Sequence, residues 1–369
     1  MNHPASAADP LNHRILCVAE DAVTGFHRHP FRCIADRTGI DEAEVISRLK
    51  GMLQAGTLRR VRQTLLSTSL AEGALIAWRV PEARLESAYA WLSAHDPFTG
   101  HVVIRECSNS TAPGADYRLW TTLKVPTGYG SVEEHNNLIK PLIGATDWVA
   151  LPVVGMFALG VGHTRRAGLR PGDKLSAPPA MQRPTSPQLS ELEWAVLLSL
   201  KESLSPSEFV SCPWESRAAA IGLSCEEYCR TAEALDTRKV IGRFATFLDH
   251  QRGGSNRSTG TGAAGLFHWA VPAGMEERAG AECGRHICMT HCYWRSGGAA
   301  FGGAQIMGVV HAPTREEVLA HKAAIDSHLA SCGIPVLHTA VFWSLRAEIR
   351  PSEISPLIYK EWLQTMQGK

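Results

Sequence analysis

The chain has 369 residues, 44% of them hydrophobic, and its 37 Lys and Arg side chains are balanced by 36 Asp and Glu. This length exceeds the size at which a single core stops growing, so we expect two or more domains. A net charge of +1 gives no overall footprint for a polyanion such as DNA. The longest apolar run, near residues 150–161, is too short to span a bilayer and the N-terminus lacks an apolar segment, so we predict a cytoplasmic protein with no membrane partner.

The two halves of the chain share a series of short motifs. His29–Phe31 matches Cys212–Trp214 at a shift of 183 residues, from Pro30 to Pro213. Further on, Trp78–Pro81 recurs as Trp269–Pro272, a shift of 191 residues. A repeat this long indicates a duplicated pair of domains rather than a solenoid unit.

Each half is predicted to open with a winged helix-turn-helix, over residues 10–72 and 189–249. Gly39 stands in the first turn, and Asp41 and Ser224 are placed as N-caps of the last helix in each unit. The predicted helices are Arg14–Glu20, Arg32–Arg37, Glu42–Ala55, Leu189–Leu204, Glu215–Ile221 and Cys225–Asp236.

The second part of each half, residues 73–165 and 266–369, is predicted as a ferredoxin-like βαββαβ domain. The fold class is therefore α+β, a tandem duplication of a winged helix-turn-helix and a ferredoxin-like domain. We expect the two sheets to pair within the chain. A homodimer of the whole chain is compatible with this pairing. The first half is assigned, in order, Ala74–Val80, a helix from Pro81, His101–Cys107, Tyr117–Val125, Ser131–Ile143 and Val149–Val154, and the second Leu266–Val271, Pro272–Ala279, His286–Trp294, Ala304–His311, Thr314–Ser331 and Val336–Trp343.

Two irregular stretches separate these domains. Residues 166–188 are rich in Pro and Gly and are the predicted linker between the halves. Residues 250–265 consist almost entirely of small and polar residues and are predicted as a flexible loop. A loop this long is either a functional lid or disordered.

A His-x-x-x-Arg motif stands on a predicted strand in each half, as His101 with Arg105 and His291 with Arg295. Residues four apart on a strand point to the same face, so each imidazole should project beside its guanidinium. This combination suits a substrate that carries carboxylates. The alternative is a purely structural polar pair. The occurrence of the motif in both halves favours a functional role.

Two other site types are less well supported. The run from Cys283 to Cys292 contains several thiols and histidines, but a strand would send Cys288 and His291 to opposite faces, which favours core cysteines over a zinc site. The last helix of each helix-turn-helix unit begins with carboxylates, at Asp41–Glu44 and Ser224–Glu227. Acidic side chains there would repel phosphates, so DNA is not an expected partner.

The order of these domains resembles the Lrp/AsnC regulators, and the internal motifs resemble a specialised branch, the siroheme decarboxylases of the alternative haem and haem d1 pathways. The motifs that carry the resemblance are Thr290–Arg295, Asp116–Leu123, Leu151–Val154 and the Trp-x-Val-Pro strand ends. The resemblance covers nearly the whole chain, as a fusion of two subunits that are often separate elsewhere.

The resemblance implies removal of carboxyl groups from the acetate side chains at C12 and C18 of sirohaem, which gives didecarboxysirohaem. The iron tetrapyrrole is then the substrate, and no other cofactor is expected. Arg105 and Arg295 would bind carboxylates, and His101 or His291 would either ligate the iron as an axial ligand or donate the proton that replaces CO₂. The predicted apolar slot is lined by Tyr117, Trp120, Tyr293 and Trp294.

The halves differ in ways that leave alternatives open. Tyr117–Trp120 becomes Gly303–Ile306 in the second half, while Val103 stands where the second half has Tyr293. We rank the second site as the more important. One alternative is a haem-binding or haem-dependent enzyme of the same fold with a different reaction, and another is an Lrp/AsnC-type ligand-responsive transcription regulator.

Overall fold

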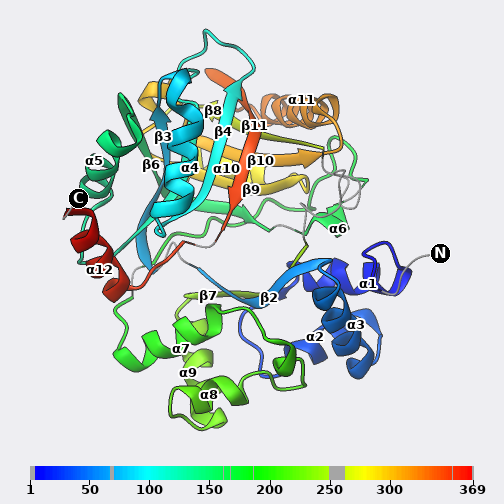
Figure 1. Ribbon diagram of the computed structural model, residues 1–369. Helices are drawn as coiled ribbons and strands as arrows, with labels where there is room; N and C mark the ends of the chain where they lie inside the picture. Colours follow the sequence, from blue (N-terminus) through cyan, green and yellow to red (C-terminus); the bar gives the residue numbers. More distant parts are fainter. Residues whose placement is uncertain are drawn as a thin grey trace. The chain divides into compact units, whose positions relative to one another are not determined.

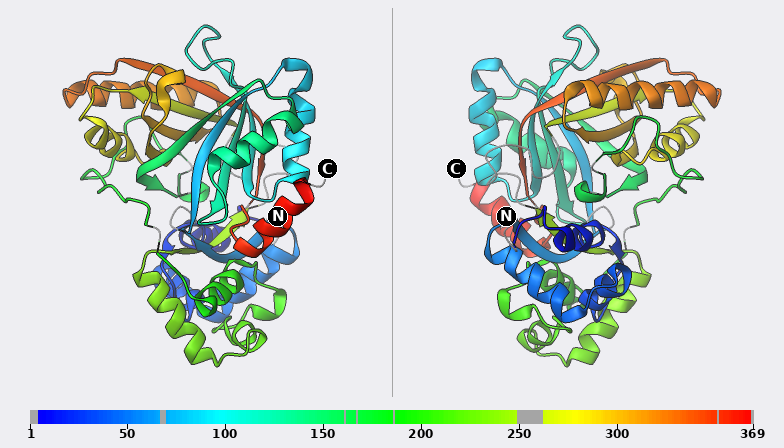
Figure 2. Two further views of the ribbon diagram at one scale, coloured as in Figure 1. Left: turned by 90° about the vertical axis from the view of Figure 1, so that its left-hand side faces the viewer. Right: turned by 90° about the vertical axis from the view of Figure 1, so that its right-hand side faces the viewer.

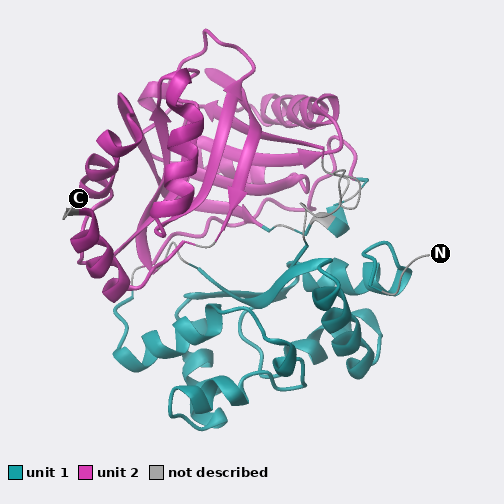
Figure 3. Ribbon diagram, viewed as in Figure 1, with its two compact units in different colours: residues 1–66, 160–168, 187–261 teal, residues 67–159, 169–186, 262–369 magenta. Residues whose placement is uncertain are grey.

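The structure, a computed structural model, describes residues 5–66, 70–160, 162–166, 168–185, 187–248, 262–350 and 352–367. The chain divides into two compact units (Figure 3). Unit 1 comprises residues 1–66, 160–168 and 187–261, and unit 2 comprises residues 67–159, 169–186 and 262–369. Within the described ranges, no helix is long and apolar enough to cross a membrane.

Unit 1 contains the helix-turn-helix segments of both halves (Figure 1). Its strands form one antiparallel sheet in the order β1-β7-β2, so β2 of the first half pairs with β7 of the second. The six predicted helices are all present. The elements are α1 (Pro10–Ala19), β1 (Val23–Thr24), α2 (Pro30–Thr38), α3 (Glu42–Gln54), β2 (Leu58–Leu65), α6 (His163–Arg166), α7 (Glu191–Lys201), η3 (Pro206–Glu208), α8 (Glu215–Ala220), α9 (Cys225–Thr237) and β7 (Ile241–Leu248).

Local chemistry explains where these helices begin. Asp41 accepts a hydrogen bond of 2.9 Å from the backbone N–H of Ala43, as an N-cap should. Ser224 forms a capping box with Glu227, and Gly39 ends α2 in the left-handed region at φ 64°. The N-cap predictions at Asp41 and Ser224 are therefore confirmed.

Unit 2 contains the order βαββαβ twice, followed by a C-terminal helix that was not predicted. The first set is β3 (Ala71–Arg79), α4 (Leu85–His95) after the short η2 (Glu82–Arg84), β4 (Thr99–Cys107), β5 (Leu119–Pro126), α5 (Val132–Ile143) and β6 (Asp147–Leu159). The second set is β8 (Ala263–Ala270), α10 (Glu276–Gly284), β9 (Met289–Arg295), η4 (Gly298–Phe301), β10 (Ile306–Ala312), α11 (Arg315–Ser331) and β11 (His338–Ile349), and the last helix is α12 (Pro356–Gln367).

All eight strands of unit 2 pair with two neighbours and close into a barrel, in the order β10-β8-β11-β4-β5-β3-β6-β9. The pairs β11–β4 and β6–β9 join the two sets, so the two sheets pair within the chain. Helices cover the outside, with α4 (cyan) and α11 (orange) on opposite sides of the strands (Figure 2). One apolar core lies under α4, α5 and α12, another lies under α10 and α11, and a third fills the inner face.

The two predicted irregular stretches have different outcomes. Residues 169–185 do not form a free linker, because Gln182 exchanges backbone hydrogen bonds of 2.8 Å with Met156 and Leu169 packs against the core under α10 and α11. Most of the loop predicted at 250–265 lies outside the described residues. Its last part is strand, since β8 begins at Ala263.

The packing of α10 on β6 predicts a destabilising substitution. A Cβ added at Gly280 would lie 2.1 Å from the ring of Phe157, which is buried and cannot move aside. We expect Gly280→Ala to lower the free energy of unfolding by about 1–3 kcal/mol, measured by chemical denaturation. Gly51→Ala is the control, because nothing lies within 4 Å of its added Cβ, and alanine should stabilise α3 by about 0.5–1 kcal/mol. Equal stability of Gly280→Ala and the wild type would contradict this close packing.

Candidate functional site

The inner face of the barrel in unit 2 combines side chains from both halves of the chain. Strand alternation sends every second residue inward, away from the helix-covered cores. The inner apolar cluster consists of Leu75, Ala77, Val103, Cys107, Tyr117, Trp120, Leu151, Leu266, Phe301, Ala304, Met307, Ala340 and Phe342. Its aliphatic and aromatic side chains pack against one another inside the barrel.

Three cationic side chains are buried in this unit without a carboxylate. Arg105 on β4 and Arg295 on β9 are each 7% exposed, and Lys124 on β5 is 9% exposed. Among the described residues, none of the three has a carboxylate within ion-pair distance, and Nε of both arginines has no hydrogen-bond partner. An unpaired buried charge is costly, so an anionic group placed beside these cations would stabilise them.

Burial changes the acid–base behaviour of these cations. It lowers the pKa of Arg105 and of Arg295 to about 10, so both remain protonated at neutral pH. Burial, with a smaller contribution from the charge of Arg295, lowers the pKa of Lys124 to about 7. Lys124 therefore lies close enough to Arg295 to be affected by its charge, and it can gain or lose a proton near neutrality.

His291, Tyr293 and Arg295 are brought together on one face of β9. The guanidinium carbon of Arg295 lies 4.5 Å from the centre of the Tyr293 ring, and the His291 and Tyr293 rings are 6.1 Å apart. Arg295 is anchored by a 2.8 Å hydrogen bond from Nη1 to the backbone oxygen of Leu151 on β6. The predicted sharing of a face by His291 and Arg295 agrees with this arrangement.

Arg105 occupies a different part of unit 2, beside Trp120. Its guanidinium carbon lies 6.0 Å from the Trp120 ring, and Nη1 donates a 2.7 Å hydrogen bond to Oγ of Ser344 on β11. Trp120 is fully buried, with ring centres 5.2 Å from Phe301 and 5.3 Å from Phe342. Its contact with Phe301, on η4 of the second half, means that aromatic side chains already fill this part of the interior.

Tyr117 belongs to the same aromatic group and has a polar anchor. Its hydroxyl donates a 2.6 Å hydrogen bond to Asp147, and Arg79 donates to that hydroxyl over 3.2 Å. Burial and the Asp147 carboxylate raise the pKa of Tyr117 to about 12, so the phenol stays protonated. Tyr117 thus supports the wall of the interior and keeps its proton.

One predicted site residue is not positioned as the sequence suggested. Trp294 lies on the opposite face of β9 from Tyr293 and packs with Cys292 in the core under α10 and α11. The structure therefore does not bring Trp294 to the inner face. His101 to Ile104 pair in unbroken register with Ile349 to Arg346 of β11, and the irregular pairing of β4 with β5 lies before Val102, so the shared face of His101 and Arg105 stays a prediction.

The structure adds residues that the motifs did not indicate. Lys124 follows Trp120 by four positions on β5, so the same alternation rule could have placed it on the inner face. Phe301 reaches Trp120 only through the fold, and no sequence pattern predicts that contact. His268 is fully buried 5.2 Å from the His338 ring, and its burial, with His338 next to it, lowers its pKa to about 3, so it is neutral.

The cysteines of the run from Cys283 to Cys292 are core residues, as the strand argument favoured. Cys283, Cys288 and Cys292 are buried in the core under α10 and α11. Cys292 Sγ donates a hydrogen bond of 3.5 Å to the backbone oxygen of Gly280. Burial raises the pKa of the Cys283 thiol well above its ordinary value. Burial also raises the pKa of the Cys292 thiol, so Cys283 and Cys292 are protonated, unlike metal-bound thiolates.

In unit 1, the carboxylates at the first turns of α3 and α9 are held by neighbouring groups. Arg32 Nε lies 2.9 Å from Glu42, and Arg28 binds Glu226 at 2.5 Å. Glu227 completes the capping box of Ser224. These turns present carboxylates where a DNA-reading helix presents donors to phosphate, so the absence of a DNA partner stays a prediction.

Comparison with known proteins identifies relatives along most of the chain. Residues 26–59 match the family described as the siroheme decarboxylase NirDL-like HTH domain. A siroheme decarboxylase of Hydrogenobacter thermophilus is 27% identical over 296 residues, which is 79% of this chain and 80% of that protein. The siroheme decarboxylase NirDL subunit of Paracoccus pantotrophus is 26% identical over 295 residues, 79% of this chain and 81% of that subunit.

The fold is also found in solved structures. The crystal structure of the siroheme decarboxylase NirDL superimposes with a TM-score of 0.66 at 20% identity, covering 96% of this chain and 98% of that chain. A second structure of NirDL, in complex with an iron-uroporphyrin III analogue, has the same TM-score and identity and covers 96% of this chain and 99% of that chain. The resemblance expected from the sequence is thus confirmed.

The buried lysine predicts a specific pH dependence of stability. An unfolded chain binds the Lys124 proton up to a pKa of about 10.4, whereas the folded protein releases it near pH 7. Between these values the unfolded state binds more protons, so the free energy of unfolding should rise with pH. Denaturation between pH 7 and pH 9 should show this rise in the wild type and a smaller one in Lys124→Met, with the exposed Lys360→Met as control. Identical pH profiles for wild type and Lys124→Met would contradict the burial of this ammonium group.

Proposed function

We propose that this chain, a relative of the siroheme decarboxylases in sequence and fold, removes the acetate carboxyl groups at C12 and C18 of sirohaem and yields didecarboxysirohaem. The observation that carries the proposal is the burial of Arg105, Lys124 and Arg295 with no carboxylate partner among the described residues. A flat iron tetrapyrrole with several carboxylates would supply the missing negative charges and would rest against the apolar inner cluster.

The effect of each cation on the reaction depends on whether it binds the reacting carboxylate or one that remains on the product. A cation that binds the reacting carboxylate stabilises the starting state and slows loss of CO₂, because the negative charge leaves that group in the transition state. Arg295 and Lys124 therefore serve best by holding the carboxylates that remain. The reacting acetate is then directed to an apolar part of the wall, where desolvation favours the uncharged CO₂ product.

Each decarboxylation breaks one C–C bond and needs one proton. The electron pair of the broken bond stays on the methylene carbon next to the macrocycle, CO₂ leaves, and a proton converts the methylene to a methyl group. His291 is the candidate donor in the second half, where its Nδ1 lies 3.1 Å from Oγ1 of Thr290. The alternative role, ligation of the substrate iron, excludes proton donation by the same nitrogen in that state. His101 is the counterpart in the first half.

The arrangement of the chain is part of the proposal. The repeated motifs and the repeated βαββαβ order support a tandem duplication in which one chain does the work of two subunits. Names such as the siroheme decarboxylase NirD subunit of Stutzerimonas stutzeri and the alpha subunit of Desulfovibrio desulfuricans fit this view, since those proteins are separate subunits. Pairing between β4 and β11 and between β6 and β9 would replace the subunit interface.

The decisive experiment is anaerobic incubation of the purified protein with sirohaem, followed by mass spectrometry of the extracted tetrapyrrole. We expect loss of one and then two CO₂ units. Binding of sirohaem with no change in its mass would reject decarboxylation. Purification with protoporphyrin haem, seen as a Soret band, together with unchanged sirohaem would instead support a haem-dependent enzyme of the same fold.

Substitutions of the candidate histidines and arginines should show which half of the chain contributes more to turnover. We expect His291→Ala and Arg295→Ala each to lower turnover by roughly a hundredfold or more, because a proton donor or an essential charge is lost. His101→Ala should cost less and slow mainly one of the two decarboxylations. The control is Arg346→Ala, an exposed arginine on β11 that pairs with Glu86. Equal losses from His101→Ala and His291→Ala, with both steps slowed alike, would show that the halves are equivalent.

A further inference from the structure

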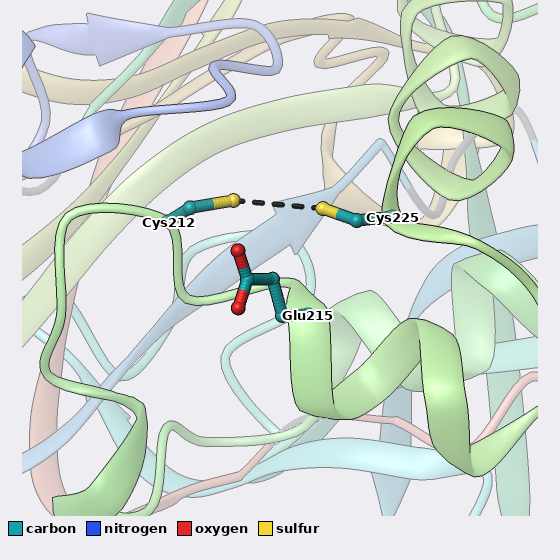
Figure 4. A group of neighbouring side chains, drawn as sticks. All are labelled: Cys212, Glu215 and Cys225. Atoms are coloured by element: carbon teal, nitrogen blue, oxygen red, sulfur yellow. Dashed lines mark hydrogen bonds between the residues drawn. The ribbon is translucent and has the colours of Figure 1, made fainter.

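Three potential metal ligands converge in unit 1, in the second helix-turn-helix. Cys212 precedes α8, Glu215 is the first residue of α8, and Cys225 is the first residue of α9. One ligand atom from each lies within 4.8 Å of the others. Figure 4 shows the two thiols pointing toward each other and the Glu215 carboxylate directed at the space beside them.

The spacing of the two sulfur atoms agrees with a tetrahedral metal centre. The Sγ atoms of Cys212 and Cys225 are 3.7 Å apart. Two thiolates at 2.3 Å from a tetrahedral zinc ion are separated by about 3.8 Å, whereas a disulfide requires about 2.05 Å. Cys229, one turn further along α9, lies 4.0 Å from Cys225 and is buried outside the trio.

The equivalent place in the first half has a different chemistry. At the shift of 183 residues, Cys212, Glu215 and Cys225 correspond to His29, Arg32 and Glu42. There Arg32 Nε lies 2.9 Å from the Glu42 carboxylate, so the position is closed by an ion pair. In the second half the cation is replaced by a carboxylate and the carboxylate by a thiol, and among the described residues Glu215 has no ion-pair partner.

The local charges do not oppose a bound cation. Arg28 lies close enough for its charge to act on neighbouring Cys229. Its guanidinium is already paired with the carboxylates of Glu226, at 2.5 Å, and Glu233, at 2.8 Å. Cys225 is the first residue of the thirteen-residue α9, so its thiol lies at the N-terminus of that helix. Each thiol would pass its proton to solvent when the metal binds.

A second trio shows what an already satisfied cluster looks like. In unit 2, Glu282, His328 and Cys332 also converge. However, Glu282 accepts from His328 Nε2 at 2.7 Å, and Lys174 Nζ lies 3.0 Å from His328 Nδ1. Arg285 is also paired with Glu282 at 3.4 Å. Lys174 and Arg285 thus already place positive charge where a metal ion would have to bind.

We propose that Cys212, Glu215 and Cys225 form a binding site for a divalent zinc ion, with water in the fourth position. Two sulfur ligands and one carboxylate are a donor set that zinc accepts in tetrahedral geometry. The ion joins the loop before α8 to the start of α9 and so fixes the second helix-turn-helix. This site is separate from the inner face of unit 2 and from the reaction proposed for it.

The test uses the full-length protein, reduced and stripped of metal, titrated with Co²⁺ as a spectroscopic probe for zinc. We expect one equivalent to bind with a thiolate-to-cobalt charge-transfer band and the visible bands of tetrahedral Co²⁺, both removed by added Zn²⁺. Cys212→Ser and Cys225→Ser should lose the charge-transfer band. Cys17→Ser, a half-buried thiol of α1 in the same unit, and His328→Ala, in the other trio, should keep it.

A variant at an exposed position completes the design. Glu215 is exposed, so Glu215→Ala should fold normally and bind Co²⁺ more weakly than the wild type, by tenfold or more. Zn²⁺ should raise the thermal midpoint of the wild type and leave that of Glu215→Ala nearly unchanged. A wild-type protein without the charge-transfer band, or a band that persists in both Cys212→Ser and Cys225→Ser, overturns the proposal. So does a Cys212–Cys225 disulfide that survives reduction.

Discussion

The pairing of strands between the two halves of the chain is the constraint on which unit 2 depends. A four-stranded ferredoxin-like sheet has two edges, and unpaired edges are exposed to aggregation. Here β4 pairs with β11 and β6 with β9, so all eight strands have two neighbours. Closure of the ring creates an inner face that neither half could form alone. Phe301 of the second half packs on Tyr117 and Trp120 of the first because of this closure.

The same closure explains why buried cations can persist. Arg295 donates to the backbone of Leu151 across the β6–β9 seam, and Arg105 donates to Ser344 across the β4–β11 seam. Each arginine is thus oriented by the other half of the chain, through one hydrogen bond that leaves most of its donors for a ligand. For Lys124, burial, with a smaller contribution from the charge of Arg295, lowers the pKa to about 7. Buried charges without a carboxylate partner cost stability in the free protein, and binding of carboxylates, as proposed, would recover that cost.

The sequence was a good guide where local rules decide the outcome. Helix starts at Asp41 and Ser224 follow from capping, and the shared face of His291 and Arg295 follows from regular alternation on β9. It was a poor guide where the alternation rule was not applied. Trp294 was grouped with its neighbour Tyr293 although adjacent strand residues face opposite sides. The contact with Phe301 arises only from tertiary structure.

The two halves have diverged at matching places in both units. In unit 2, Tyr293 supplies a phenol beside Arg295 where the first half has Val103. The first half has the Trp120 ring where strand pairing places Met307 in the second half, and not Ile306 as the motif alignment suggested. In unit 1, the Arg32–Glu42 ion pair of the first half is replaced by the donors Glu215 and Cys225. A chain duplicated as proposed can accept such changes, because a residue lost from one half can be supplied by the other inside the same closed ring. Unequal halves that share one inner face therefore suit the proposed reaction, whose two reacting acetates are not equivalent.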